Sequence, residues 1–362
     1  MEYPPVSVVM PVRNEERHLA ESVRHVLSQD YPGEFELVLA VGPSADRTEQ
    51  IARDLAAAEP RLTVVANPSG QIPSALNAAL RAARHAVIAR VDGHALLPPG
   101  YLRIAVETLA KTGAADVGGV MAAEGQTPFQ KAVAWAMTSK VGVGSAAFHT
   151  GGGAGLTLSV YLGVYQRAAI ERAGGWDEGM LRAEDWELNH RIRTRGGTIW
   201  FTPDLRVTYR PRASVRTLAA QYFHYGRWRR VIVREHPETA SFRYLAPPAA
   251  AALVAAGLAE GLVGLGAVAA GAGPKWWIVG FAIPVIYAAG VAAAGLLLSR
   301  ELPAKVRLRI PLALGAMHMA WGTGFLTSPR RLHQASPKRQ PGEPDTRVGQ
   351  PDAAQENTAA AG

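Results

Sequence analysis

Two short stretches of the sequence place acidic and imidazole side chains close enough to act together. Asp92 and His94 flank a glycine, so both side chains can turn to one side and meet a single divalent ion. Carboxylate and imidazole ligands suit Mn²⁺ or Mg²⁺. The second stretch, residues 182–189, places three acids at the expected start of a helix. Each stretch also has a structural alternative, because Asp-Gly is a common turn and the helix dipole favours acids at a helix start.

The composition excludes several other kinds of site. The 362 residues contain no cysteine, which excludes disulfides, thiolate zinc sites and cysteine nucleophiles. No G-x-x-x-x-G-K-[ST] occurs, and no G-x-G-x-x-G follows the first expected strand, so ATPase and ordinary dinucleotide-binding interpretations fall. The net charge of +8 leaves nucleic acid, anionic lipid and phosphorylated substrates as partner classes.

The first 125 residues predict the elements that position these side chains. Runs of β-branched residues alternate with helical stretches, which is typical of a βαβ series. The expected strands are residues 6–12, 35–41, 62–66, 86–91 and 117–121, and the expected helices are 15–29, 46–58, 73–84 and 99–112. We therefore expect an α/β fold with a mostly parallel sheet covered by helices. Ligands of such sheets bind at the carboxyl ends of the strands, where residues 11–15, 42–48 and 91–94 fall.

The C-terminal third predicts an α-helical membrane region. Between Tyr244 and Ser299 only Glu260 and Lys275 are charged, and the apolar stretches 245–272 and 276–298 are each long enough to cross a bilayer. A pair of buried helices is the soluble alternative. A third stretch, 310–326, is shorter and either spans or is re-entrant. The expected divisions are 1–243 for the globular domain, 244–328 for two or three membrane helices, and 329–362 for a disordered tail.

The expected orientation follows from charge. No cleavable signal peptide opens the chain, so we expect the first 240 residues to be cytoplasmic. Two spans return the basic loop 300–309 to the cytoplasm, as the positive-inside rule requires. Three spans would put the basic residues 330–339 outside, so the side of the tail stays open.

An arginine-rich segment precedes the first apolar stretch. Residues 182–243 contain thirteen arginines and six acids, with aromatic residues interleaved at about 214–235. We interpret 214–235 as an interfacial segment that contacts anionic headgroups or a lipid diphosphate. A solvated basic helix is the alternative. A nucleic-acid partner is not expected, because no base-reading or stacking module is recognisable.

Four short motifs occur in an order that resembles one family. They are P-V-x-N-E at 11–15, S-x-D-x-T at 44–48, D-x-H at 92–94 and an E-D pair at 184–185. Over residues 5–235 the chain resembles the family 2 glycosyltransferases of GT-A fold. Within that family it looks most like the membrane-attached, succinoglycan ExoA-like group, including the G-R-W at 226–228.

The resemblance implies roles for individual residues. Asp185 would be the catalytic base, and Asp92 and His94 would hold the metal on the donor diphosphate. The donor-binding residues would be Pro11, Val12, Arg13, Asn14, Glu15, Ser44, Asp46, Asn77 and Asp92. Glu184, Trp186, Gln221, Arg227 and Trp228 would serve the acceptor and its diphosphate. Five residues separate Gln221 from Arg227 where the processive pattern has two, so processivity is not predicted.

The expected activity is sugar transfer with inversion. The donor would be a nucleotide sugar, and a UDP-sugar is the first expectation. The acidic residues that the family usually has before the Ser at position 44 are absent here. The acceptor would be a lipid-linked glycan of polysaccharide biosynthesis at the cell membrane, and the cofactor Mg²⁺ or Mn²⁺. Two alternatives come from other classes: an inactive relative that binds nucleotide sugar or partner enzymes, and a nucleic-acid-binding membrane protein.

Overall fold

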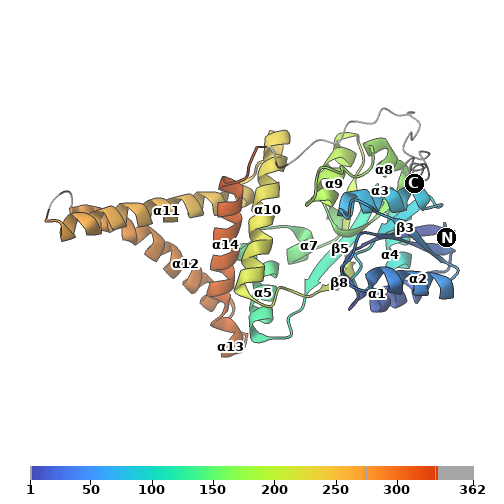
Figure 1. The fold of residues 1–362 in the computed structure, drawn as a ribbon, viewed down its shortest axis with the longest axis horizontal. Coiled ribbons are helices and arrows are strands. Elements are labelled where there is room, and N and C mark those ends of the chain that lie inside the picture. Colours follow the sequence, from blue (N-terminus) through green and yellow to red (C-terminus); the bar gives the residue numbers. More distant parts are fainter. Residues whose placement is uncertain (1, 272, 274, 331, 333–362) are drawn as a thin grey trace, which may run out of the picture.

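The computed structural model describes residues 2–271, 273, 275–330 and 332. One twisted sheet, covered by helices on both faces, forms the globular part, and a group of long helices projects from one side of it (Figure 1). The predicted tail, 329–362, lies outside the described residues except for 329, 330 and 332.

The sheet is mixed, with the strand order β3-β2-β1-β4-β7-β5-β8-β6. Strands β3, β2, β1 and β4 are mutually parallel, β7 runs antiparallel to both β4 and β5, and β8 is parallel to β5. The strands are β1 (Val6–Val12), β2 (Phe35–Val41), β3 (Leu62–Ala66), β4 (Val87–Arg90), β5 (Asp116–Ala123), β6 (Gly155–Leu156), β7 (Tyr161–Gln166) and β8 (Ile199–Tyr209). The five predicted strands are all present, within two residues at each end.

Helices pack on both faces of this sheet. Those of the globular part are α1 (Leu19–Leu27), α2 (Thr48–Ala58), α3 (Ile72–Ala82), α4 (Tyr101–Thr112), α5 (Pro128–Thr138), α6 (Lys140–Val143), α7 (Ala147–Thr150), α8 (Arg167–Ala173) and α9 (Glu184–Thr194). The four predicted helices form, but α1 begins four residues later than expected. Asn14 has a positive φ of 55°, the chain bends at residues 13–14, and residues 16–18 form a turn before the helix starts. The chain is thereby free to place polar groups at the end of β1.

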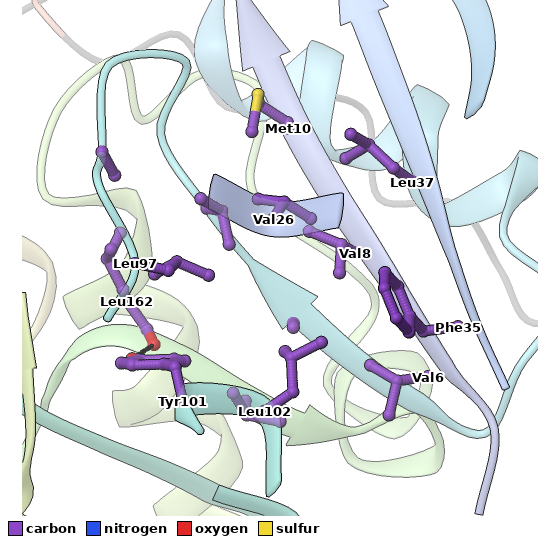
Figure 2. Close-up of a cluster of buried hydrophobic side chains, with 14 of the residues drawn as sticks. Val6, Val8, Met10, Val26, Phe35, Leu37, Leu97, Tyr101, Leu102 and Leu162 are labelled. Atoms are coloured by element: carbon purple, nitrogen blue, oxygen red, sulfur yellow. Dashed lines mark hydrogen bonds between the residues drawn. The ribbon is translucent and has the colours of Figure 1, made fainter. Parts of the chain in front are cut away.

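The apolar core follows from the strand sequences. Alternate residues of β1 point to opposite faces: Val6, Val8 and Met10 pack with α1, α2 and α4, and Val9 packs with α3, α8 and α9. Figure 2 shows the first of these clusters, with side chains from β1, β2, α1 and α4. There the Tyr101 hydroxyl donates a hydrogen bond of 2.6 Å to the Leu162 carbonyl. Because both faces are buried, the strands read as continuous apolar runs.

The C-terminal region is helical, and its helices fall into two groups: one projects from the globular part and the other packs against it. The elements of this region are α10 (Val215–Glu235), the short 3-10 helix η1 (Pro237–Thr239), α11 (Phe242–Ala269), the 3-10 segment η2 (Lys275–Phe281), α12 (Ala282–Leu298), α13 (Ala304–Arg307) and α14 (Ile310–Leu326). Helices α11 and α12 project away from the sheet (Figure 1), and most of their side chains are exposed. Two helical segments are long and apolar enough to cross a membrane: α11 (Phe242–Ala269) and Trp276–Leu298, which combines most of η2 with α12.

Helix α14, the third predicted apolar stretch, lies along α10 and contacts α5. Two glycines allow this close approach. A Cβ on Gly226 would lie 2.0 Å from the Trp321 carbonyl oxygen, and one on Gly324 would lie 2.1 Å from the Phe223 carbonyl oxygen. Ile310, Leu314 and Met317 are buried in the same contact region. The end of the described chain therefore packs against the arginine-rich helix.

Candidate active site

The carboxyl ends of β1 and β2 are joined by hydrogen bonds between their loops. The Asn14 backbone N–H donates to the Ser44 hydroxyl (3.1 Å), and the Asn14 side-chain oxygen accepts from the Ala45 N–H (2.8 Å). The Arg13 guanidinium donates to the carbonyls of Pro43 and Gly70, both at 3.2 Å. Of the other residues predicted to bind the donor here, Val12 is buried within β1 and Pro11 precedes it. The loop after β1 is thus a rigid neighbour of the loop after β2.

Asp46 organises the start of α2. Its carboxylate accepts hydrogen bonds from the Thr48 N–H (3.0 Å), the Thr48 hydroxyl (2.5 Å) and the Glu16 N–H (3.2 Å). These bonds, led by that of the Thr48 hydroxyl, lower the pKa of Asp46. Asp46 therefore stays ionised and fixes the loop in which donor binding is predicted.

The predicted metal ligands lie on the same edge of the sheet. His94 is half exposed, and its Nδ1 lies 2.8 Å from the Glu15 carboxylate, whose hydrogen bond raises the pKa of the imidazole. A Cβ on Gly93 would lie 2.8 Å from the Val12 side chain, so a larger residue there would force the end of β1 to shift. Asp92 is partly exposed. Carboxylate and imidazole groups suit Mn²⁺ or Mg²⁺ by type, but Glu15, Asp92 and His94 do not bring three ligand atoms within 4.8 Å of one another.

A single arginine at the end of β4 connects this edge to the acid pair. Arg90 is buried, and its guanidinium contacts three carboxylates. Its Nη1 lies 2.6 Å from Asp92 Oδ1, its Nε lies 3.2 Å from Asp185 Oδ2, and its Nη2 lies 3.5 Å from Glu184 Oε1. The contact with Asp185 is an ion pair without the alignment of a hydrogen bond. The structure thus brings together residues that are more than 90 positions apart.

Asp185 has a second partner, which a loop holds in place. The Trp176 indole N–H donates to Asp185 Oδ1 at 3.0 Å. Trp176 is itself fixed by Asn77, whose side chain accepts from the Trp176 N–H (2.9 Å) and donates to the Trp176 carbonyl (2.8 Å). Asn77, predicted in the donor pocket, also donates to Glu178 at 3.1 Å. It therefore positions the loop that orients Asp185.

The three acids of α9 differ in environment. Burial, and then the neighbouring Asp185, raises the pKa of Glu184 to about 7. Glu187 is buried in an ion pair with Arg191 (2.5 Å) one turn along the helix. Helical geometry alone predicts that Glu184 and Asp185 point about 100° apart, yet both reach Arg90. Ala183, the residue just before the helix, has a positive φ of 61°, and the pair follows it directly.

The predicted acceptor residues separate into three places. Glu184 contacts Arg90, as above. Trp186 and Trp228 pack in one small apolar cluster between α9 and α10. Gln221 donates to the hydroxyls of Tyr209 and Tyr225, both at 2.8 Å, while Arg227 lies over the Phe223 ring at 5.7 Å. Gln221 and Arg227 therefore have partners of their own, on α10 and at the end of β8.

The structure also assembles a cluster that the sequence did not indicate. His190, His236 and Glu238 place one ligand atom each within 4.8 Å of one another, as no other three such residues of the described chain do. His190 Nε2 lies 3.3 Å from the Glu238 carboxylate, and Arg193 Nη2 lies 3.4 Å from His190 Nδ1. The positively charged Arg193 side chain thus lies next to this cluster. The three residues come from two segments with no regular spacing, so no sequence signal could have found them.

Comparison with known proteins identifies the family. A model described as glycosyl transferase family 2 matches residues 7–174. The succinoglycan biosynthesis protein ExoA of Rhizobium meliloti (strain 1021) is 31% identical over 321 residues, which cover 88% of this chain and 93% of that protein. The chain belongs to the family 2 glycosyltransferases. This confirms the resemblance carried by the four motifs.

Two further proteins extend the comparison. A mannosyltransferase from Pyrobaculum calidifontis, solved in complex with GDP-Man and Mn²⁺, shares the fold with a TM-score of 0.56 at 22% identity, covering 88% of each chain. A Methanococcus voltae glucuronosyltransferase, named for a dolichyl N-acetyl-α-D-glucosaminyl phosphate acceptor, is 21% identical over 64% of this chain and 74% of its own. The mixed sheet with its helices is therefore a GT-A fold, followed by the helical C-terminal region.

Proposed function

We propose that this glycosyltransferase moves a sugar, with inversion, from a nucleotide-sugar donor to a lipid-linked glycan acceptor in polysaccharide biosynthesis. One observation carries the proposal. The acid pair of α9 lies at the carboxyl ends of the strands, where Arg90 contacts Asp92, Glu184 and Asp185. Ligands of such sheets bind at that edge, so a base and a leaving-group site meet there.

Asp185 is the proposed general base. It accepts the proton of the acceptor hydroxyl as the oxygen attacks the anomeric carbon of the donor. The Trp176 indole and the Arg90 guanidinium each contact one of its oxygens, so the carboxylate is fixed before substrate arrives. General base catalysis of this kind is typically worth 10²- to 10⁴-fold in rate. A single base opposite the leaving group gives inversion, hence a β-linkage from an α-linked donor.

Asp92 and His94, with Glu15 beside them, are the proposed ligands of a divalent metal, Mn²⁺ or Mg²⁺. When bound, such an ion neutralises charge on the departing nucleoside diphosphate. Support comes from the carboxylate and imidazole groups that lie at this edge of the sheet and from the Pyrobaculum mannosyltransferase, whose structure was solved with GDP-Man and Mn²⁺. The loops of Arg13, Asn14, Ser44 and Asp46 are the proposed nucleotide-binding surface, with a UDP-sugar as the first donor to test.

The acceptor and the location are proposed from the C-terminal helices. Two exposed apolar helices follow the arginine-rich α10, which suits an enzyme that meets a lipid-borne substrate at a membrane surface. The Methanococcus relative is named for a dolichyl-linked acceptor, and the Rhizobium relative for succinoglycan biosynthesis. We propose residues 1–243 as the cytoplasmic catalytic domain, 244–328 as a multi-pass membrane region, and 214–235 as the interfacial segment.

The proposal is tested with purified membranes and a panel of nucleotide sugars. Release of nucleoside diphosphate is measured with Mn²⁺, with Mg²⁺ and with EDTA. We expect release with one donor, lost in EDTA and in Asp92→Ala. Donor binding without release under any condition would favour the inactive relative instead, and undiminished release in EDTA would reject the metal site. For orientation, protease added to intact cells should leave residues before Tyr244 uncut, and cleavage there would refute the cytoplasmic placement.

A further inference from the structure

A buried arginine lies where α9, α10 and α11 meet. Arg229 of α10 is 7% exposed. Its guanidinium carbon lies 4.5 Å from the centre of the Trp186 ring and 3.9 Å from that of Tyr244. Burial lowers the pKa of Arg229 to about 10, and the positive charge of Arg243 contributes to the shift. The guanidinium is therefore held between two aromatic rings with another cation close by.

Two more arginines lie close to this place, one of them against Tyr244. The Arg243 guanidinium carbon lies 4.4 Å from the centre of its ring, and the same side chain donates a hydrogen bond to its hydroxyl. Arg193 of α9 lies nearby, because its Nη2 is 3.4 Å from His190 Nδ1 and the His190 ring stacks on Trp186 with the ring centres 5.5 Å apart. We call Arg193, Arg229 and Arg243 the arginine cluster. Three positive charges thus share one partly buried space.

This arginine cluster has no acid of its own. Among the described residues, none of the three arginines forms an ion pair, and the neighbouring Glu238 contacts His190 and His236 instead. Buried donors also lack acceptors there: Arg229 Nε and Nη1, Arg193 Nε and the Trp186 indole N–H have no hydrogen-bond partner in the described chain. Buried charges are normally paired and buried donors normally bonded. An anion with several acceptor oxygens would satisfy both the unpaired charges and the unbonded donors of this site.

A phosphate group fits this deficit. Its oxygens accept several hydrogen bonds and donate almost none, and guanidinium groups bind it in a bidentate way. The place of the site indicates the source of the phosphate, because α11 begins at the neighbouring Phe242, which is 86% exposed, and runs on as an apolar helix. An apolar helix beside the site has no role in binding a soluble anion, whereas a lipid chain would pack against it.

We propose that Arg193, Arg229 and Arg243 bind the phosphate of a lipid-borne acceptor at the membrane surface. This rests on the proposed function and names the recognition element of its acceptor. Trp186, against which Arg229 packs, follows Asp185 in the chain, so one helical turn carries both the proposed base and a wall of the phosphate site. Arg227 lies over Phe223 and takes no part in the cluster.

The test measures lipid binding by the full chain without any nucleotide sugar. Nanodiscs of phosphatidylcholine contain a polyprenyl monophosphate in one set and the uncharged polyprenol in another. We expect the phosphate to strengthen binding by about ten- to a hundredfold, the value of charged hydrogen bonds. Arg229→Met should abolish that difference and Arg229→Lys should restore part of it. The matched control is Arg230→Met, the next residue of α10, whose guanidinium carbon lies 4.9 Å from the centre of the Phe325 ring on α14.

The outcomes separate the alternatives. A phosphate preference that survives in Arg229→Met, or that Arg230→Met removes equally, overturns the proposal. If Arg229→Met does not fold, Arg243→Met tests the same site from the less buried side and should lower the preference by about tenfold. Competition by inorganic diphosphate at equal concentration would assign the site to a soluble anion and overturn the lipid source. Because no donor is present, failure of sugar transfer would refute the proposed function and leave this result standing.

Discussion

Helix α9 lies between two charged regions that are built in opposite ways. On the Asp185 side, one arginine serves three carboxylates, and Trp176 donates to the one that is proposed to react. On the Trp186 side, none of the three arginines forms an ion pair with a carboxylate in the described chain, and buried donors there lack acceptors. In the first region the positive and negative side chains pair with each other, whereas in the second the positive side chains have no carboxylate paired with them in the described chain. We infer that the first is preorganised for chemistry and that the second is completed by a ligand.

The largest expected effect comes from the acid pair. Asp185→Asn keeps the shape and removes the proton acceptor, so the rate of transfer should fall by about 10²- to 10⁴-fold with little change in donor affinity. Steady-state kinetics and donor titration measure the two quantities. Glu187→Gln is the control, because Glu187 pairs with Arg191 and should lower the rate far less. Near-normal turnover in Asp185→Asn, with loss in Glu184→Gln, would move the base to Glu184, whose raised pKa of about 7 suits that role.

The next effect is on stability at the region of paired charges. Arg90→Met leaves three carboxylates without their shared cation, and breaking a buried pair in this way costs about 3–5 kcal/mol. Thermal unfolding of the purified chain should show it as a clear fall in Tm. Arg53→Met is the control, since Arg53 belongs to an exposed ion pair on α2 and should change Tm little. Equal Tm values for the two variants would contradict the central position of Arg90.

A smaller loss is expected where α14 holds α10. Gly324→Ala puts a Cβ where the Phe223 carbonyl lies, and such overpacking costs about 1–3 kcal/mol. Because α10 carries Arg229, we expect phosphate-lipid binding to weaken while donor binding is spared. Gly315→Ala, in the same helix with nothing within 4 Å, should be neutral or stabilising by up to about 1 kcal/mol. Equal effects of the two changes would show that the close approach does not fix α10.

The smallest effect sharpens the contrast between the two regions. Without ligand, Arg229→Met removes a buried cation that has no acid to leave unpaired. Replacing such a charge by an apolar side chain is neutral or stabilising, so Tm should stay within a few degrees of the unchanged protein or rise. Differential scanning calorimetry of Arg229→Met beside Arg90→Met makes the comparison directly. A fall as large as that of Arg90→Met would mean that the cluster is already paired.

The sequence predicted elements that depend on local patterns. The first three strands have the expected bounds, and the acids and His94 at the strand ends were found because strand, turn and helix signals lie next to one another. Arg90 was missed because it stands between Ala89 and Val91 in an apolar run, and nothing nearby indicates acids 94 positions later. The arginine cluster was seen only as an excess of charge. Its shape depends on how α9, α10 and α11 cross, which tertiary packing decides.

The contact between α10 and α14 also bears on how the chain is made. The Ser328 hydroxyl, just after α14, donates to the Arg227 carbonyl of α10 across 101 positions of sequence, beside the two glycine contacts. A ribosome that adds about 5–20 residues per second takes roughly 5–20 s to cover that distance. During this interval the apolar hairpin α11–α12 emerges from the ribosome, and the face of α10 that later packs against α14 has no partner. Under the proposed membrane placement, the hairpin therefore inserts before α14 packs against α10, and a nascent chain stopped before α14 leaves that face of α10 exposed to chaperones.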